Sequence, residues 1–404
     1  MVEYTPKQRA LMGMWENGEL RRINLLEGSV SSGKTWISLV LWAFWVGSMP
    51  QEKLYLMCAK SLTTLKRNCL ILLQELVGER NFTFSIPAKE GVLFGRRVLF
   101  EGANDARAES KIRGMTLQGA YCDELTQFPE DFFTMLLSRL RVAGAKLIAT
   151  TNPDHPNHWL MRRYIERADE LDFLDVKFTI DDNTTLPPDY VENIKREYTG
   201  VFYDRFILGA WVVAEGLVYP MFSEAQHVVD EIPWQALQRG RWYISVDYGT
   251  VNPTSAGLWC LWNGTAYRVN EYYYDSREPG KARRTDEEHY AELEALAGER
   301  RIERVIVDPS AASFKETIRR HGRFAVWDAD NSVLDGIRLT ASLLQARRVL
   351  IHRDCNGLLS EITAYRWDTD APEDTVVKEA DHACDDMRYF CSTIMEREVR
   401  ANGV

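Results

Sequence analysis

One contiguous motif constrains the fold of this chain more than any other feature. Residues 28–35 match the pattern G-x-x-x-x-G-K-[ST], with Leu25-Leu26-Glu27 leading into them as a strand and an apolar helix after them at residues 36–45. Strand, loop and helix in this order are the context that the motif requires. Glycines let backbone N–H groups surround phosphates, and the first turn of the following helix adds partial positive charge. We therefore expect a phosphate-binding loop of the P-loop NTPase type.

The positions of this loop have separate expected roles. Lys34 would contact the β- and γ-phosphates of ATP, and Thr35 would ligate Mg²⁺. The loop backbone would bind the nucleotide through Gly28, Ser29, Val30, Ser31, Ser32 and Gly33. A chance match in an unrelated loop is the alternative, and the flanking strand and helix argue against it.

A second apolar stretch ends in two acidic residues. Residues 119–122 are followed directly by Asp123 and Glu124. In phosphate-loop enzymes such a strand places an aspartate near Mg²⁺, and a following glutamate can polarise the attacking water. We assign Asp123 to the metal and Glu124 to the catalytic base, with a solvated acidic turn as the alternative.

Three more residues are candidates for the nucleotide site. Asn152 follows the expected strand at residues 147–151 and could contact the γ-phosphate or its water, although a strand before an Asn-Pro turn explains the pattern equally well. Gln8 could recognise the adenine edge, because its amide offers a donor and an acceptor side by side. Arg139 and Arg141 are candidate arginine fingers. A surface glutamine and a solvated helix face are the alternatives for these last assignments.

Length and composition indicate two globular domains. The chain has 404 residues, which is more than a single domain with one hydrophobic core usually contains. Its hydrophobic content of 45 % is that of a folded globular protein. We place a P-loop ATPase domain at residues 1–210, a linker at residues 211–240, where glycine and proline interrupt the pattern, and a second domain at residues 241–404. The net charge of −10 excludes a uniformly basic nucleic-acid coat but allows a local basic groove.

Cysteine usage and hydropathy indicate a cytoplasmic location. The seven cysteines include no C-x-x-C pair, which is typical of reduced thiols. The longest apolar run, residues 36–46, is too short to span a bilayer. We therefore expect no association with a membrane.

The second half of the chain has the element order of a ribonuclease H-like nuclease. Three strands come first, the last two joined by an Asn263-Gly264 turn, and strands then alternate with helices. The expected strands occupy residues 242–247, 255–262, 267–274 and 305–308, and the first expected helix occupies residues 286–300. The predicted fold class is α/β: an N-terminal P-loop NTPase domain, with a mostly parallel sheet covered by helices on both faces, and a C-terminal ribonuclease H-like domain.

Two of these strands end in an aspartate, and further aspartates occur in a final helix, which is expected at residues 379–395. Asp247 ends the first strand of this half, and Asp308 ends the later one. The chemistry of this fold needs carboxylates around two metal ions, here Mg²⁺ or Mn²⁺. A turn-forming role is the alternative for each aspartate.

The final helix supplies the third candidate ligand. Asp381 and Asp385 are four residues apart and would share one face of the helix. We favour Asp385 as the ligand, with Asp381 and His382 as neighbours that bind, orient or transfer protons. Asp386 would point away, solvated or paired with Arg388.

The phosphate loop and five short motifs occur in one order along the chain. These motifs are Cys122-Asp123-Glu124, Thr150-Thr151-Asn152, Asp247-Tyr248-Gly249, Asp308-Pro309-Ser310 and Asp381-His382-Ala383-Cys384-Asp385. The combination resembles the large terminase subunits, the DNA-packaging motors of tailed bacteriophages and prophages, and most closely the PBSX-like type. The resemblance covers about residues 4–395.

The resemblance implies a function and a set of partners. An N-terminal ATPase would drive double-stranded viral DNA into a procapsid, and a C-terminal endonuclease would cut concatemeric DNA. The small terminase subunit would deliver the DNA. The chain would form a homo-oligomeric ring on the portal protein during packaging and could be monomeric in solution.

The resemblance also implies residue roles. It places Asn152 in the motif that couples hydrolysis to movement, and it places the nuclease metals on Asp247, Asp308 and Asp385. Many relatives carry an arginine inside the phosphate loop, where this chain has Val30-Ser31-Ser32. We therefore assign that role to Arg139 of a neighbouring subunit.

Two other function classes are compatible with parts of the sequence. A cellular helicase–nuclease would need a second motor lobe, and the second half begins instead with nuclease spacing at Asp247. A non-enzymatic prophage remnant would not need Lys34 or the acidic residues, all of which are present.

Overall fold

The computed structural model describes residues 4–104, 108–250 and 252–401. The chain divides into two compact units: Met1–Lys195 with Val201–Val213, and Arg196–Gly200 with Ala214–Val404. Each unit is described by itself. The division expected at residues 211–240 stays a prediction.

The first part of the chain alternates short strands and helices. Its strands are β1 (Ile23–Gly28), β2 (Leu54–Ala59), β3 (Phe82–Ser85), β4 (Glu90–Leu93), β5 (Arg96–Gly102), β6 (Leu117–Cys122), β7 (Lys146–Thr151) and β8 (Phe173–Phe178). Its α-helices are α1 (Pro6–Glu16), α2 (Lys34–Ser48), α3 (Leu62–Leu65), α4 (Ile71–Val77), α5 (Ala108–Ile112), α6 (Glu130–Arg139), α7 (Trp159–Arg163), α8 (Pro188–Glu197) and α9 (Gly200–Phe206). A π-helix, η1 (Lys66–Leu70), joins α3 to α4, and 3₁₀ turns lie at η2 (Leu125–Gln127), η3 (Ile165–Arg167) and η4 (Ile180–Asp182).

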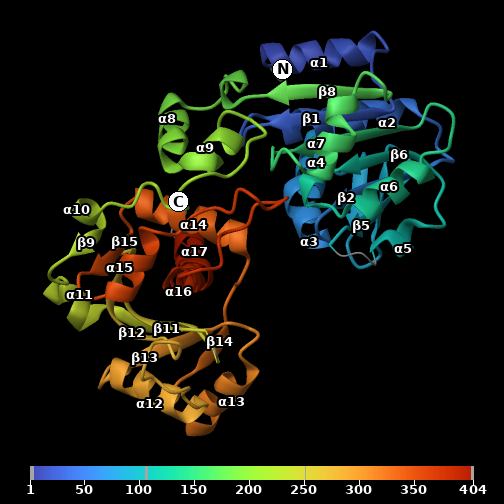
Figure 1. The fold of residues 1–404 in the computed structure, drawn as a ribbon. Coiled ribbons are helices and arrows are strands. Elements are labelled where there is room, and N and C mark those ends of the chain that lie inside the picture. Colours follow the sequence, from blue (N-terminus) through green and yellow to red (C-terminus); the bar gives the residue numbers. More distant parts are fainter. Residues whose placement is uncertain (1–3, 105–107, 251, 402–404) are drawn as a thin grey trace. The chain divides into compact units, whose positions relative to one another are not determined.

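The described residues of the first unit form an eight-stranded sheet in the order β3-β4-β5-β2-β6-β7-β1-β8. Pairing is parallel from β5 to β8, and β3 and β4 add an antiparallel edge. Alternate strand residues pack against α1, α2 and α4 on one face and against α5, α6 and α7 on the other (Figure 1). The predicted mostly parallel sheet with helices on both faces is therefore confirmed.

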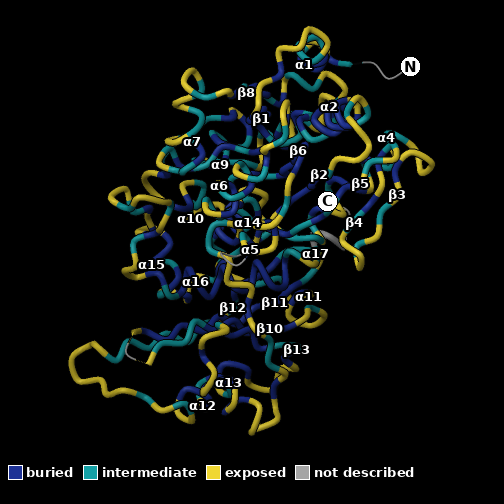
Figure 2. Tube along the Cα trace, turned by 90° about the vertical axis from the view of Figure 1, so that its right-hand side faces the viewer, coloured by how far each residue is buried: buried dark blue, intermediate teal, exposed yellow. Residues whose placement is uncertain are grey.

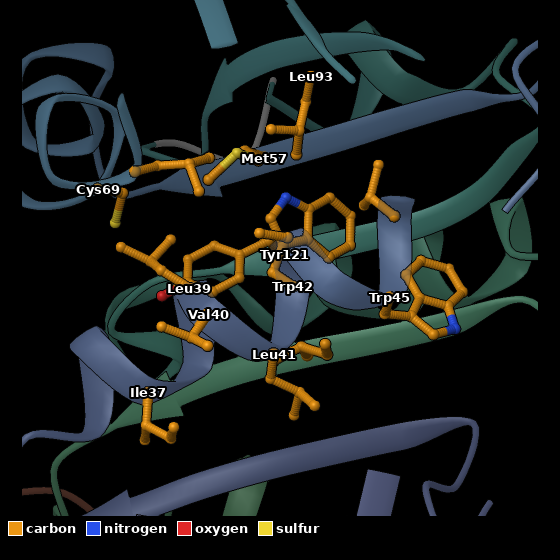
Figure 3. Packing of buried hydrophobic residues seen from close by; sticks show 14 of the residues in the cluster. Ile37, Leu39, Val40, Leu41, Trp42, Trp45, Met57, Cys69, Leu93 and Tyr121 are labelled. Atoms are coloured by element: carbon orange, nitrogen blue, oxygen red, sulfur yellow. The ribbon is translucent and has the colours of Figure 1, made fainter. Parts of the chain in front are cut away.

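The core holds the helix that follows the phosphate loop in a defined place. Trp42 and Trp45 on α2 are buried, and the Trp42 ring centroid lies 6.0 Å from that of Tyr121 on β6 (Figure 3). A Cβ atom at Gly119 would lie 2.3 Å from the Trp45 ring, so this close approach requires glycine. The packing of α2 on β6 thereby fixes the first turn of the helix, which carries Lys34, relative to the end of that strand.

The second unit has a mixed sheet. Its strands are β9 (Val228–Val229), β10 (Arg241–Asp247), β11 (Thr254–Trp262), β12 (Thr265–Tyr274), β13 (Ile302–Val307), β14 (Val326–Asp328) and β15 (Val349–His352). Its helices are α10 (Glu224–His227), α11 (Trp234–Arg239), α12 (Asp286–Ala297), α13 (Ala312–His321), α14 (Val333–Gln345), α15 (Asn356–Ile362), α16 (His382–Phe390), the π-helix η5 (Cys391–Met395) and α17 (Glu396–Ala401).

In the part of this unit that the structure describes, the sheet order is β14-β13-β10-β11-β12-β15-β9. β10, β11 and β12 form the predicted antiparallel meander, and β13 lies parallel to β10. The hairpin between β11 and β12 turns at Asn263 (φ 49°) and Gly264 (φ 75°). Two consecutive positive φ values are those of a type I′ turn, which favours this Asn-Gly pair.

Helices cover both faces of the second sheet. Trp242, Ile244 and Val246 on β10 belong to the cluster that includes residues of α12 and α13. On the opposite face, Trp259 of β11 stacks on Phe390 of α16 with ring centroids 4.5 Å apart. Both central strands are consequently buried along most of their length (Figure 2). The alternation along β10 places its remaining side chains, including Asp247, on the α16 face.

All seven cysteines are free and buried, in agreement with the reduced thiols expected from the sequence. Among the helices that the structure describes, none combines the length and the apolar character needed to cross a membrane.

Candidate functional site

The phosphate loop depends on its two glycines. Gly28 has φ 130°, and a Cβ atom there would lie 1.8 Å from the Phe178 carbonyl oxygen. Gly33 has φ 83° and precedes the first turn of α2. Ser31 also has a positive φ, 54°, and its carbonyl oxygen accepts a hydrogen bond from Asn183 Nδ2 at 2.8 Å. The loop backbone is therefore held in a conformation that other residues at the glycine positions would oppose.

Lys34 is folded into its own loop. Its ammonium donates to the carbonyl oxygens of Gly28 (3.1 Å) and Ser29 (2.6 Å) and to Asn152 Oδ1 (3.0 Å), and the residue is 6 % exposed. Burial lowers the pKa of Lys34 to about 8, although neighbouring carboxylates oppose the shift. The N-terminus of α2 with a lysine ammonium beside it is an anion-binding arrangement.

The acidic pair lies at the end of β6, beside β7. Thr150 Oγ1 donates to Asp123 Oδ1 at 2.9 Å, and Asn152 Nδ2 donates to both Glu124 carboxylate oxygens at 3.2 and 3.3 Å. Glu124 has φ 56° and ψ 61°, a left-handed conformation that non-glycine residues adopt mainly where surrounding structure imposes it. Asn152 thus joins Lys34 and Glu124 in one hydrogen-bonded group. We call this group, with Asp123 and the phosphate loop, the nucleotide site.

Three predicted residues lie around this group in different ways. Thr35 is half-buried in the first turn of α2, next to Lys34. Gln8 is buried, its Oε1 accepts from Thr5 N at 3.0 Å as part of the α1 capping box, and its Nε2 lies beside Gly33. Arg139 ends α6, and its hydrogen bonds within the described chain go to Ser138 and Arg113, outside the group around Lys34.

A cavity of about 430 Å³ lies in the segment that follows β8. Asn183 lines it and also donates to the phosphate loop, which places the cavity next to the nucleotide site. The other lining residues are Ile180, Asp181, Thr184, Leu186, Pro188, Val191, Glu192 and Lys195. No sequence motif indicates this cavity.

The second unit brings Asp247 and Asp308 together. β10 and β13 are parallel neighbours with Val246 opposite Val307, so the next residue of each strand lies at the same edge. Tyr389 Oη donates to Asp308 Oδ2 at 2.8 Å and to Asp247 Oδ1 at 3.4 Å. The two predicted carboxylates therefore share one hydroxyl group from α16.

The charge state of this region is set by burial and by close charged neighbours. Burial raises the pKa of Asp247, and so do Asp385 and Asp308, although a hydrogen bond with His382 opposes them. His382 Nδ1 lies 2.8 Å from Asp247 Oδ2. Burial lowers the pKa of His382, but this contact and nearby acids outweigh burial and raise it. For Asp308, burial raises the pKa, and hydrogen bonds led by those with Ser310 lower it by more.

The third predicted ligand is paired with cations. Arg388 Nη2 donates to Asp385 Oδ1 at 2.9 Å, and Lys378 Nζ lies 3.5 Å from Asp385 Oδ2. Lys378 also lies 3.1 Å from Asp381 Oδ2. We call Asp247, Asp308 and Asp385, with these partners, the acidic site.

The acidic site fits divalent cations in its chemistry. Carboxylate oxygens are the ligands that Mg²⁺ prefers, and the mutual effect of the acids on the pKa of Asp247 marks a concentration of negative charge that a cation would relieve. As the side chains stand, no group of three or more His, Cys, Asp or Glu within residues 4–104, 108–250 and 252–401 is arranged to hold an ion. A bound ion would share the carboxylate oxygens with Tyr389 and the cationic partners or displace these partners.

Comparison with known proteins decides the family. A family model described as terminase large subunit, T4likevirus-type, N-terminal, matches residues 25–226, half of the 404 residues. The chain belongs to the large terminase subunit family. A curated relative, the terminase large subunit of Escherichia phage T5, is 23 % identical over 312 residues, which cover 72 % of this chain and 68 % of the relative.

Solved structures agree over nearly the whole terminase chain. The large terminase from a thermophilic bacteriophage has a TM-score of 0.90 and 35 % sequence identity, covering 98 % of this chain and 100 % of its own. The same thermophilic-phage protein in complex with ATP-gamma-S has a TM-score of 0.87 and 35 % identity, covering 97 % and 100 %. The α/β fold of both units, predicted from the sequence, is thus shared with a large terminase.

Two expectations about the last helix of this terminase chain need correction. Asp386, expected to be solvated or paired with Arg388, is fully buried and accepts hydrogen bonds from Ser245 Oγ and Arg268 Nη2, both at 3.0 Å. α16 is buried on the sheet, so the residue after Asp385 faces β10 and β11 rather than solvent. The helix expected from residue 379 begins at His382, and the π-helix η5 follows it.

Sequence reasoning missed several partners of the predicted residues. Tyr389 lies four residues after Asp385, so helical spacing could have indicated it. Glu361 accepts from the backbone N–H groups of Ala383 (2.6 Å) and Cys384 (3.2 Å) at the start of α16, and no local pattern indicates this contact.

Proposed function

We propose that this terminase chain hydrolyses ATP at the nucleotide site to move double-stranded viral DNA into a procapsid. The observation that carries the proposal is the hydrogen-bonded connection from Lys34 through Asn152 to Glu124. It joins a phosphate-binding cation, a coupling residue and a candidate base, as phosphoryl transfer requires. The thermophilic-phage relative forms complexes with ADP and ATP-gamma-S, which supports ATP as the ligand.

The residues of the nucleotide site would divide the work. Lys34 and the loop backbone would bind phosphates, and Glu124 would accept a proton from the attacking water. Thr35 and Asp123 would hold Mg²⁺, which supplies charge neutralisation on the phosphates when bound. The roles of Gln8 at the adenine and of Arg139 as a finger from a neighbouring subunit remain part of the proposal.

We further propose that the acidic site cuts concatemeric DNA. Asp247, Asp308 and Asp385, with Asp381 beside them, would hold one or two Mg²⁺ or Mn²⁺ ions, which activate water and stabilise the leaving oxygen. His382 contacts Asp247 and would orient it or transfer a proton. The small terminase subunit, the portal protein and a ring of copies are the partners that this function requires.

Two assays on the full chain test the proposal. Phosphate release should rise when linear double-stranded DNA is added, and Lys34→Ala should abolish it while the exposed control Lys53→Ala does not. Plasmid nicking should depend on Mg²⁺ or Mn²⁺ and disappear in Asp308→Asn but not in Asp354→Asn, whose side chain is 75 % exposed. A wild-type chain without DNA-stimulated hydrolysis would contradict the motor function, and nicking in excess EDTA would contradict the metal assignment.

A further inference from the structure

The helix after β2 contains a π-helical turn that touches the nucleotide site. α3 passes into the π-helix η1 at Lys66–Leu70 before α4 continues. Asn68, in this turn, donates from Nδ2 to Asp123 Oδ2 at 3.2 Å. Burial, and after it the neighbouring Asp123, raises the pKa of the Cys69 thiol in the same turn. Single π-turns inside α-helices are uncommon and frequent at functional positions, because the wider turn redirects side chains.

Both oxygens of Asp123 are therefore held by neutral donors from two different elements. Thr150 Oγ1 on β7 donates to Oδ1, and Asn68 on η1 donates to Oδ2. Asp123 itself is 1 % exposed. Hydrogen bonds of this kind orient a ligating carboxylate, and removal of such a partner commonly weakens metal binding about 10–100-fold.

The π-turn is anchored firmly enough to act on Asp123. Ser61 caps α3 through a hydrogen bond from Thr64 N at 3.1 Å, and Leu65, Leu70 and Leu73 are fully buried. A Cβ atom at Gly102, at the end of β5, would lie 3.3 Å from the Ser61 Cα, so β5 packs directly against the start of this helix. The packing of this helix therefore fixes where Asn68 lies relative to Asp123.

The outer side of the same segment is basic. Lys60, Lys66 and Arg67 are exposed, and in the described chain none of them takes part in a salt bridge. Arg67 Nε donates to Asn68 Oδ1 at 3.3 Å. A continuous path of hydrogen bonds therefore runs from an exposed guanidinium through one amide to the carboxylate of Asp123.

We propose that Asn68 is a positioning residue for Asp123, and that Arg67, with Lys60 and Lys66, receives phosphates of the DNA backbone. Phosphate is the anion that unpaired, exposed arginine and lysine side chains bind in DNA complexes. Arg67 hydrogen-bonds directly to the amide of Asn68, so contact with DNA changes the hydrogen bonding of Asn68 and, through it, of Asp123. The segment would let DNA engagement set the orientation of the Mg²⁺ ligand. This inference rests on the proposed ATPase function.

The first test measures metal binding and does not need turnover. The ADP-dependent part of Mn²⁺ binding, obtained from electron paramagnetic resonance of free Mn²⁺ with and without ADP so that binding at the acidic site cancels, should weaken at least tenfold in Asn68→Ala and in the isosteric Asn68→Leu. ADP binding in EDTA should stay within twofold of wild type. The matched control is Asn81→Ala, in the turn between α4 and β3, where Asn81 Nδ2 donates to the Val77 carbonyl oxygen at 2.8 Å. Unchanged Mn²⁺ affinity in either folded Asn68 variant would overturn the positioning role.

The second test concerns the link to DNA. The ratio of ATP hydrolysis with linear double-stranded DNA to hydrolysis without it should fall toward one in Arg67→Ala, and the Mg²⁺ concentration for half-maximal hydrolysis should rise at least tenfold in Asn68→Ala. A wild-type DNA response in Arg67→Ala and in the Lys60→Ala, Lys66→Ala, Arg67→Ala triple variant would overturn the DNA contact. If the wild-type chain itself shows no hydrolysis, the proposed function fails, whereas the Mn²⁺ measurement still decides the role of Asn68.

Discussion

The nucleotide site and the acidic site differ in the partners of one carboxylate: both contain carboxylates held by neutral donors, but only the acidic site has a carboxylate, Asp385, held by cations. In the nucleotide site, Asp123 and Glu124 accept hydrogen bonds from neutral threonine and asparagine side chains. In the acidic site, Asp385 is paired with Arg388 and Lys378. Neutral donors orient a carboxylate and leave its charge available, whereas cationic partners neutralise it. We therefore expect a divalent ion to add to neutral partners in the first site and to compete with existing cations at Asp385 in the second.

The largest effect should come from removing the candidate base of the nucleotide site, which also tests whether the two sites act independently. Glu124→Gln should lower ATP hydrolysis about 10²–10⁴-fold, the usual contribution of a general base. Packaging should stop, while Mn²⁺-dependent plasmid nicking continues because the acidic site is untouched. Phosphate release and nicking measured on one preparation check this, and an active Glu124→Gln ATPase would refute the base assignment.

The contrast between cationic and neutral partners should appear in stability. Arg388→Met leaves the buried Asp385 without its arginine and should cost about 3–5 kcal/mol, as for other broken buried ion pairs. The matched change in the nucleotide site, Thr150→Val, removes a neutral donor from Asp123 and should cost about 1–3 kcal/mol. Hydrogen exchange of the β10 and β6 amides reports the two changes separately. Equal costs would show that the nature of the partner does not matter.

The acidic site should be removable without loss of the motor. Asp247→Ala should lower DNA cleavage at least about 100-fold, because even indirect partners of a metal commonly contribute 10–100-fold. ATP turnover should stay at the wild-type level. Loss of both activities in a chain with unchanged circular dichroism would mean that the sites are not separable.

The smallest effect concerns a carboxylate beside the phosphate loop. Burial raises the pKa of Glu27, and a 2.5 Å hydrogen bond from Trp211 Nε1 lowers it. Since the net folded pKa lies above the ordinary value of 4.5, ionised Glu27 costs stability as pH rises through and above that value. Trp211→Phe should raise the pKa further and cost about 1.5 kcal/mol at pH 8 and much less at pH 4. Hydrogen exchange of the β1 amides at both pH values, corrected for intrinsic exchange rates, measures this loss of stability. A loss that does not depend on pH would contradict the explanation.

The sequence predicted local elements better than it predicted their partners. The loop of residues 28–35, the helix after it and the Asn263-Gly264 hairpin were predictable because each is encoded by neighbouring residues. The environment of Asp386 was not, since Arg268 is 118 positions away and only the packing of α16 on the sheet brings the two together. The same holds for Asn68, whose contact with Asp123 depends on a π-turn that no local pattern indicates.

The sequence by itself determined the family and the fold class, because glycines, turn residues and strand-ending acids act over a few adjacent positions. Tertiary structure alone decided which groups surround each charged side chain. It places Asn152 between Lys34 and Glu124, Tyr389 between Asp247 and Asp308, and cations beside Asp385. The physical reason is the distance along the sequence over which the interactions act. Backbone conformation is set by near neighbours in sequence, whereas the state of a carboxylate depends on burial and on charges that folding collects from distant segments.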